Sequence, residues 1–174
     1  MRVLSEYIKL ENGKNSNFRY AEFVKSETAT RLDIPNEPNE EHWLNIEALV
    51  QNVLQPIRDK FGPLRITSGY RSSRLCEAIG SSTTSNHTRG QAADIEPYDY
   101  DTPLFDIVEF VHDELEYREL IAEYFPDGWV HVAYREEDNN RQLKLKDADH
   151  DYDVVDVDYI RGIYVPEELF DMDC

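Results

Sequence analysis

Apolar residues recur at three- and four-residue steps between positions 43 and 61, and this spacing predicts one amphipathic helix. The apolar stripe consists of Trp43, Ile46, Leu49, Val50, Val53, Leu54, Ile57 and Phe61. Asn39 is suited to the N-cap of this helix, and the Gly62-Pro63 pair ends it. Pro56 predicts a bend in the last turn, because proline has no N–H for the helix ladder. We therefore expect this segment to be the helical scaffold of the core.

Shorter patterns along the chain predict further elements. Apolar and β-branched runs predict short strands at 64–68, 91–95, 129–134 and, on a hairpin, 141–146. A second helix is expected from an N-cap at Ser72 to Ile79, and a third helix is opened by Thr102 and Pro103. Strands and helices are mixed along the chain, which is typical of an α+β fold.

The length and the charge of the chain limit what it can be. Its 174 residues suffice for one domain, which we assign to residues 18–146, with a polar lead-in at 1–17 and an acidic extension at 147–174. The formal net charge is -18, and a field of that sign repels phosphate backbones and anionic lipids, so we expect no nucleic-acid partner.

The sequence also favours a protein made in the cytoplasm. No apolar run approaches the ~20 residues that a membrane span needs, and the first residues show no secretion signal, so we expect no membrane insertion. Two cysteines are too few for a disulfide framework, which agrees with reduced thiols.

Three side chains form a candidate metal site. His87 and Asp94 stand seven residues apart across a segment of small residues, and imidazole nitrogen and carboxylate oxygen are zinc ligands. A catalytic zinc keeps three protein ligands, and His131 is the best candidate for the third. It lies in an expected strand where Trp129 and Ala133 share its face, as in a pocket wall. The alternative for His131 is a core histidine bonded to a carbonyl, and for His87 a surface polar residue.

Three motifs now resemble those of a known family. They are the run Ser68-Gly-Tyr-Arg-Ser72, the Ser-x-His-x-x-Gly-x-Ala-x-Asp pattern that begins at Ser85, and the run Trp129-Val-His131. Together they resemble the zinc D-alanyl-D-alanine carboxypeptidase family, which includes dipeptidases and the L-alanyl-D-glutamate endopeptidases of phage endolysins. The resemblance implies a Hedgehog-like α+β fold: a small, mostly antiparallel sheet flanked by helices, with zinc in a groove across it.

The resemblance also implies roles for single residues. His87, Asp94 and His131 would hold zinc, and Arg71 would stabilise the oxyanion; its alternative is a salt bridge that holds the turn. Residues Ser85, Tyr70 and Trp129 would contact substrate, although Ser85 is equally suited to capping a loop.

The general base departs from the family pattern. The family often has an acidic residue three positions before the second histidine, where this chain has Gly128. The nearest carboxylate is Asp127, which we expect to be the base, with Glu123 as the alternative.

The resemblance implies a zinc-dependent peptidase that cleaves peptidoglycan stem peptides containing D-amino acids. Its gene would belong to a phage or prophage, and the product would reach the wall after membrane disruption or in a virion, with a virion or lysis-system partner. Two alternatives remain: a non-catalytic, zinc-stabilised structural or wall-binding phage component, and a D,D-carboxypeptidase.

Overall fold

The structure is a computed structural model that describes residues 2–147, 151–152 and 156–164. The strands are β1 (Tyr7–Lys9), β2 (Asn15–Arg19), β3 (Leu64–Ser68), β4 (Ala92–Pro97), β5 (Glu119–Glu123), β6 (Trp129–Ala133), β7 (Gln142–Lys146) and β8 (Asp151–Tyr152). The helical segments are α1 (Tyr20–Val24), α2 (Glu27–Arg31), α3 (Glu40–Leu49), η1 (Val50–Leu54), α4 (Gln55–Phe61), α5 (Ser73–Ala78), η2 (Asn86–Arg89), α6 (Leu104–Glu114) and α7 (Val157–Tyr164). Among these residues no helix is long and apolar enough to cross a lipid bilayer.

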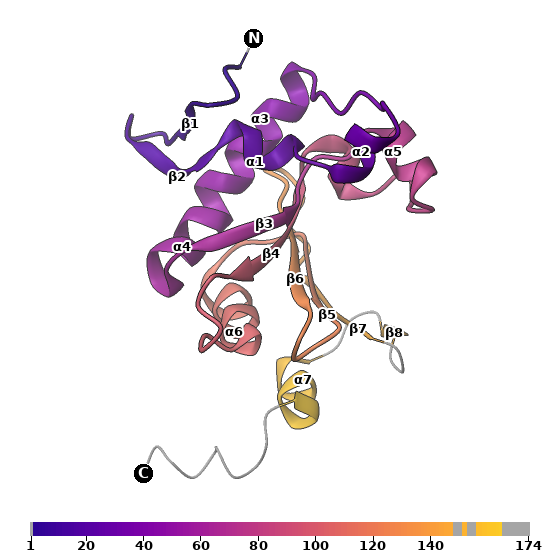
Figure 1. The fold of residues 1–174 in the computed structure, drawn as a ribbon. Helices are drawn as coiled ribbons and strands as arrows, with labels where there is room; N and C mark the ends of the chain where they lie inside the picture. Colours follow the sequence, from indigo (N-terminus) through magenta and orange to yellow (C-terminus); the bar gives the residue numbers. More distant parts are fainter. Residues whose placement is uncertain (1, 148–150, 153–155, 165–174) are drawn as a thin grey trace.

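The main sheet has the strand order β3-β4-β6-β5-β7-β8, and β1 and β2 form a separate hairpin (Figure 1). All neighbours in the main sheet are antiparallel except β5 and β7, which run parallel. The expectation that residues 141–146 form a hairpin strand with the strand of His131 is therefore wrong. The reason is that β4 and β5 already occupy the two edges of β6, so β7 cannot pair with β6 and joins the sheet beside β5.

The two faces of the main sheet differ in character. Side chains alternate between the faces of a strand, and β5 and β7 both show buried residues only at every second position. The apolar face includes Ile95, Val130, Val132, Leu120 and Leu145, all fully buried. These residues belong to one core cluster with residues of α3, α4 and α6, so the opposite face is left for polar side chains.

The expected scaffold helix is present as one continuous helical path, α3–η1–α4 (Figure 1). The Asn39 side chain accepts a hydrogen bond from the His42 N–H as the N-cap, and Gly62 ends α4 at a φ of 85°. The segment η1 before Pro56 is a π-helix, which fits the loss of a regular hydrogen bond at proline. The sequence thus predicted the extent and cap of the helix but not its π-helical turn.

Both ends of the chain contribute to the fold. Ile8 of β1, within the expected lead-in, is fully buried in the core cluster. In the expected acidic extension, β8 pairs with β7, and α7 packs against α6 with Ile160 fully buried. The guanidinium of Arg161 on α7 also lies over the ring of Phe105 on α6, and its central carbon is 5.1 Å from the ring centroid.

This packing predicts different effects for two isoleucines of α7. Ile160→Ala should lower the free energy of unfolding by about 2–4 kcal/mol, because it leaves a cavity in the core. Ile163→Ala is the matched control, since Ile163 is 38 % exposed and should change stability by less than about 0.5 kcal/mol. Urea unfolding of both variants measures the difference; equal stabilities would show that α7 is not part of the cooperative unit.

Candidate metal centre

The segment that carries His87 is held by local backbone constraints. Ser85 caps the 3-10 helix η2, and its hydroxyl accepts a hydrogen bond from the His87 N–H at 3.3 Å. Gly90 ends η2 in the left-handed region, at a φ of 70°, where a Cβ would lie 2.4 Å from the His42 carbonyl oxygen. Glycine at this position therefore lets η2 lie against α3 and fixes the place of His87.

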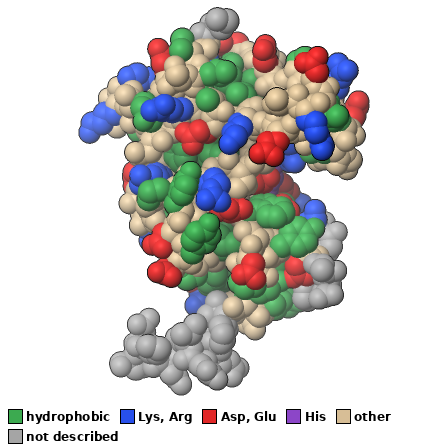
Figure 2. All heavy atoms as spheres, viewed as in Figure 1, with side chains coloured by type: hydrophobic (Ala, Val, Ile, Leu, Met, Phe, Trp, Pro, Cys, Tyr) green, Lys and Arg blue, Asp and Glu red, His purple; other side chains and the backbone are tan. Residues whose placement is uncertain are grey.

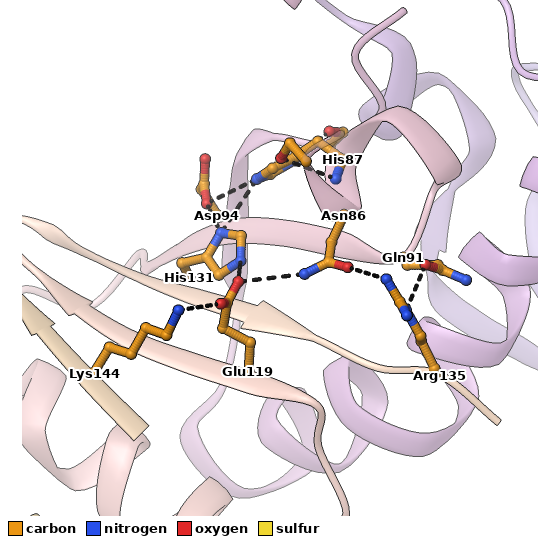
Figure 3. A network of polar contacts seen from close by, with 10 residues as sticks. Asn86, His87, Gln91, Asp94, Glu119, His131, Arg135 and Lys144 are labelled. Carbon is orange, nitrogen blue, oxygen red and sulfur yellow. Dashed lines mark hydrogen bonds and ion pairs between the residues drawn. The ribbon is translucent and has the colours of Figure 1, made fainter. Parts of the chain in front are cut away.

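The other two side chains of the candidate site come from paired strands. Asp94 on β4 lies directly opposite His131 on β6, so their side chains leave the sheet on the same face. His87 reaches them from η2, and Figure 3 shows the three side chains converging. All three residues are buried.

The distances among the three donor atoms suit a metal ion. His131 Nδ1 lies 2.8 Å from Asp94 Oδ1 and 3.2 Å from His87 Nε2, and His87 Nε2 lies 3.3 Å from Asp94 Oδ1. Tetrahedral ligands at about 2.1 Å from zinc are roughly 3.4 Å from one another. Within the described ranges, these residues form a group that could hold a metal, with one ligand atom from each. The donor set fits zinc.

The other nitrogen of each imidazole has an acceptor beside it. His87 Nδ1 lies 2.7 Å from the carbonyl oxygen of Gly69, which makes Nδ1 the donor and leaves Nε2 facing Asp94. A Cβ on Gly69 would lie 2.6 Å from the Phe23 carbonyl oxygen, so only glycine fits there. His131 Nε2 lies 3.3 Å from Glu119 Oε1 on β5.

Glu119 is the centre of a wider polar network (Figure 3). Lys144 Nζ lies 2.8 Å from Glu119 Oε2, and the Asn86 amide donates to Glu119 Oε1 at 3.3 Å. Arg135 donates to Asn86 at 3.0 Å and to Gln91 at 2.9 Å, which ties β6 to both ends of η2. The network therefore couples the orientation of His131 to the segment that carries His87.

Electrostatics at the site follow from burial and close pairing. Burial lowers the pKa of His87. Burial also opposes the charged forms of Asp94 and His131, but in both cases the polar contacts outweigh burial. The two imidazoles lower the pKa of Asp94. The contacts with Asp94 and Glu119 raise the pKa of His131 to about 9. The contact with His131, helped by Lys144, lowers the pKa of Glu119 to about 2.

A cavity of about 680 Å³ opens beside the three side chains. His87 and His131 line it together with Arg71, Ser85 and Glu123, among others. Figure 2 shows a hollow in the molecular surface below the region of α2 and α5. Glu123 is on the same strand face as Ile121, the cross-strand partner of His131, which puts it diagonally across from His131. Burial, with repulsion from Asp94, raises the pKa of Glu123.

The other predicted site residues lie elsewhere. Asp127 is exposed and lines a separate cavity of about 700 Å³ with residues of α6 and with Tyr164. Tyr70 is buried and packs against the His42 ring at 5.3 Å. Trp129 packs against Tyr124, with 5.3 Å between the ring centroids, and lines neither of these two cavities. The structure thus brings Arg71, Ser85 and Glu123 to the candidate site and keeps Asp127 away from it.

Sequence reasoning missed Glu119 because it missed β5. The run Glu-Leu-Ile-Ala-Glu at 119–123 alternates between half-buried and buried positions in the structure. In the sequence it shows only three consecutive apolar residues between two glutamates, and so short an apolar run is a weak strand signal.

A buried cluster of two histidines and one carboxylate beside a cavity is typical of the active sites of metal-dependent enzymes. A family model described as Peptidase M15 matches residues 16–133, more than half of the chain, and the chain belongs to this family. Peptidases of the family depend on zinc and the family acts on peptidoglycan-type substrates, so membership supports a zinc metallopeptidase. No curated protein sequence matches the chain.

The network predicts that Glu119 supports metal binding without being a ligand. Glu119→Gln should weaken zinc binding about 10- to 100-fold, because groups that orient a ligating histidine have effects of that size. Competition with a chromogenic chelator measures the affinity. Glu116→Gln is the control, since Glu116 is an exposed carboxylate that pairs with Arg141. Equal zinc affinities of the two variants would show that Glu119 does not orient His131.

Proposed function

We propose that this protein is a zinc peptidase that hydrolyses amide bonds of peptidoglycan stem peptides containing D-amino acids. The observation that carries the proposal is the cavity beside the metal cluster, because His87 and His131 line it together with the cation Arg71 and the half-buried carboxylate Glu123. Amide hydrolysis needs these groups, namely a metal, a proton acceptor and a positive charge.

In this proposal His87, Asp94 and His131 are the zinc ligands. Zinc bound there supplies a Lewis acid for the scissile carbonyl and lowers the pKa of water. Gly69 and Glu119 hold the imidazoles in place, as their contacts with His87 and His131 indicate. The burial of the three ligands keeps competing water away from them.

Glu123 acts as the general base in place of Asp127. It lines the cavity, and its raised pKa gives it more affinity for the proton of an attacking water than an exposed carboxylate has. The same residue then returns the proton to the leaving amine. Asp127 does not line this cavity: its side chain is exposed and lies in the other cavity.

Arg71 stabilises the negative charge that develops on the carbonyl oxygen. Its side chain lines the cavity together with His87 and His131, which brings the guanidinium within reach of a substrate bound there. No ion pair of Arg71 occurs within the described part of the chain, which disfavours the reading in which Arg71 only holds the turn.

We also propose the cell wall as the place of action, because the substrate is there. Origin from a phage or prophage, with a partner in a virion or lysis system, stays a prediction that rests on the likeness of motifs alone. A D,D-carboxypeptidase would release a free amino acid and an endopeptidase a peptide, so product analysis on purified muropeptides separates the two.

Zinc content and turnover should respond together to chelation. We expect one zinc per chain after purification, and chelation should abolish release of stem-peptide fragments from Gram-negative peptidoglycan, with recovery on return of zinc. Elemental analysis and chromatography of the products measure the two quantities. Bound zinc without release would favour a structural or wall-binding component, and absence of zinc would contradict the ligand assignment.

Two carboxylate variants should separate the candidate bases. Glu123→Gln should lower kcat about 10²- to 10⁴-fold, the usual contribution of a general base, while the zinc content stays at the parent level. Asp127→Asn is the matched control and should leave kcat near the parent value. A large loss in Asp127→Asn with normal turnover in Glu123→Gln would reverse the assignment.

A further inference from the structure

A second cavity, of about 540 Å³, adjoins the candidate active site. Arg71 and Ile79 line both cavities, so the two spaces meet at these residues. One wall of the second cavity is the chain from Lys25 to Thr28, which includes the start of α2, and the other is β3. We call this space the β3 groove. It gives a substrate room to extend beyond the metal cluster on the side of β3.

The β3 groove runs along an edge of the sheet and not over one face. Four consecutive residues of β3, 65–68, line it. Successive side chains of a strand point to opposite faces, so a space that touches four in a row must lie beside the strand. β3 is the terminal strand of the main sheet, and no described strand pairs with its second edge. Such an edge can bind an extended peptide through main-chain hydrogen bonds.

Charge along the β3 groove is opposite in sign to that of the whole chain. The lining includes the cations Lys25, Arg65 and Arg71, and Glu27 is the one carboxylate among the lining residues. The full sequence has twice as many acidic as basic residues, 36 against 18. This local excess of positive charge favours a ligand with carboxylates.

The cations are placed in different ways. Arg65 is fixed by an ion pair with Glu96 at 3.2 Å and by the Tyr98 ring, 4.9 Å from its guanidinium carbon. Lys25 is exposed and makes no ion pair within the described ranges, so its ammonium is available to a ligand. Arg65 on β3 and Lys25 on the opposite wall therefore place positive charge on both sides of the groove, which suits an anionic peptide bound between them.

We propose that the β3 groove binds an extended, carboxylate-bearing segment of the peptide substrate, on one side of the scissile bond. This inference rests on the proposed peptidase function and specifies its substrate as an anionic peptide bound along the edge of β3. Lys25 and Arg65 contact substrate carboxylates, and Arg71 joins the groove to the reacting carbonyl.

The test compares synthetic stem pentapeptides with the full-length, zinc-loaded protein. One peptide has all carboxylates free, and in the others one carboxylate at a time is amidated. For the parent, one amidation should raise KM about fivefold with kcat unchanged, the upper range for an exposed ion pair. Lys25→Glu should remove this discrimination, because it replaces the attracting charge with a repelling one.

Lys14→Glu is the matched control, with the same change in net charge at an exposed residue that lines none of the three cavities. It should keep the parent's discrimination. Discrimination that persists in Lys25→Glu, or is lost equally in Lys14→Glu, would overturn the proposal. If the parent cleaves no peptide, the peptidase function fails, and calorimetric binding of the same peptides decides on the groove alone: equal affinity for free and amidated peptides would overturn it.

A second measurement addresses the extended conformation. Methylation of each backbone amide of the peptide in turn removes one donor, and at one position at least it should weaken binding about fivefold, as expected for one lost hydrogen bond. Unchanged affinity at every position would rule out pairing with the β3 edge.

Discussion

Asp94 and His131 are cross-strand partners on β4 and β6, so both side chains must leave the sheet on the same face. A slip of one residue in this pairing would turn one of them into the core and separate the pair. The register is held by Ala93 and Val132, a neighbouring pair that points the other way and is fully buried. The hydrophobic core therefore determines the geometry of the polar cluster, although none of its side chains belongs to that cluster.

The same arrangement places a carboxylate where burial is costly. Asp94 lies between two imidazoles, and their contacts, not solvent, keep its carboxyl ionised. Each imidazole in turn has an oxygen outside the cluster beside its other ring nitrogen: the Gly69 carbonyl for His87 and the Glu119 carboxylate for His131. These acceptors come from the end of β3 and from β5, so the site requires the four neighbouring strands β3, β4, β6 and β5 to be assembled. A divalent cation among the three donor atoms would offset the remaining cost of burial.

The sequence allowed the scaffold helix and the three clustered residues to be predicted, because both depend on local spacing. The position of a residue in the sheet depends instead on which distant strands pair, and the spacing of residues along the sequence does not reveal this pairing. Asp127 is only four residues from His131 in sequence, yet it lies in the connection between β5 and β6 and belongs to neither strand. Glu123 is eight residues away, but antiparallel pairing of β5 with β6 places it opposite Trp129 and near His131. With β5 unrecognised, neither Glu119 nor the parallel β7 could be predicted.

Net charge and local charge lead to different conclusions about binding partners. At physiological salt an exposed charge acts over about 8 Å, so most of the 36 carboxylates are screened from a ligand in the cavities. The ligand instead meets the residues that line the cavities: Lys146 and Arg71 with Glu119 and Glu123 beside the metal cluster, and Lys25 and Arg65 with Glu27 in the β3 groove. The overall charge still repels long polyanions, which must approach across much of the surface. A short peptide with one or two carboxylates, as proposed for the β3 groove, would meet mainly the cations of that groove, and its small size would favour it over a nucleic acid.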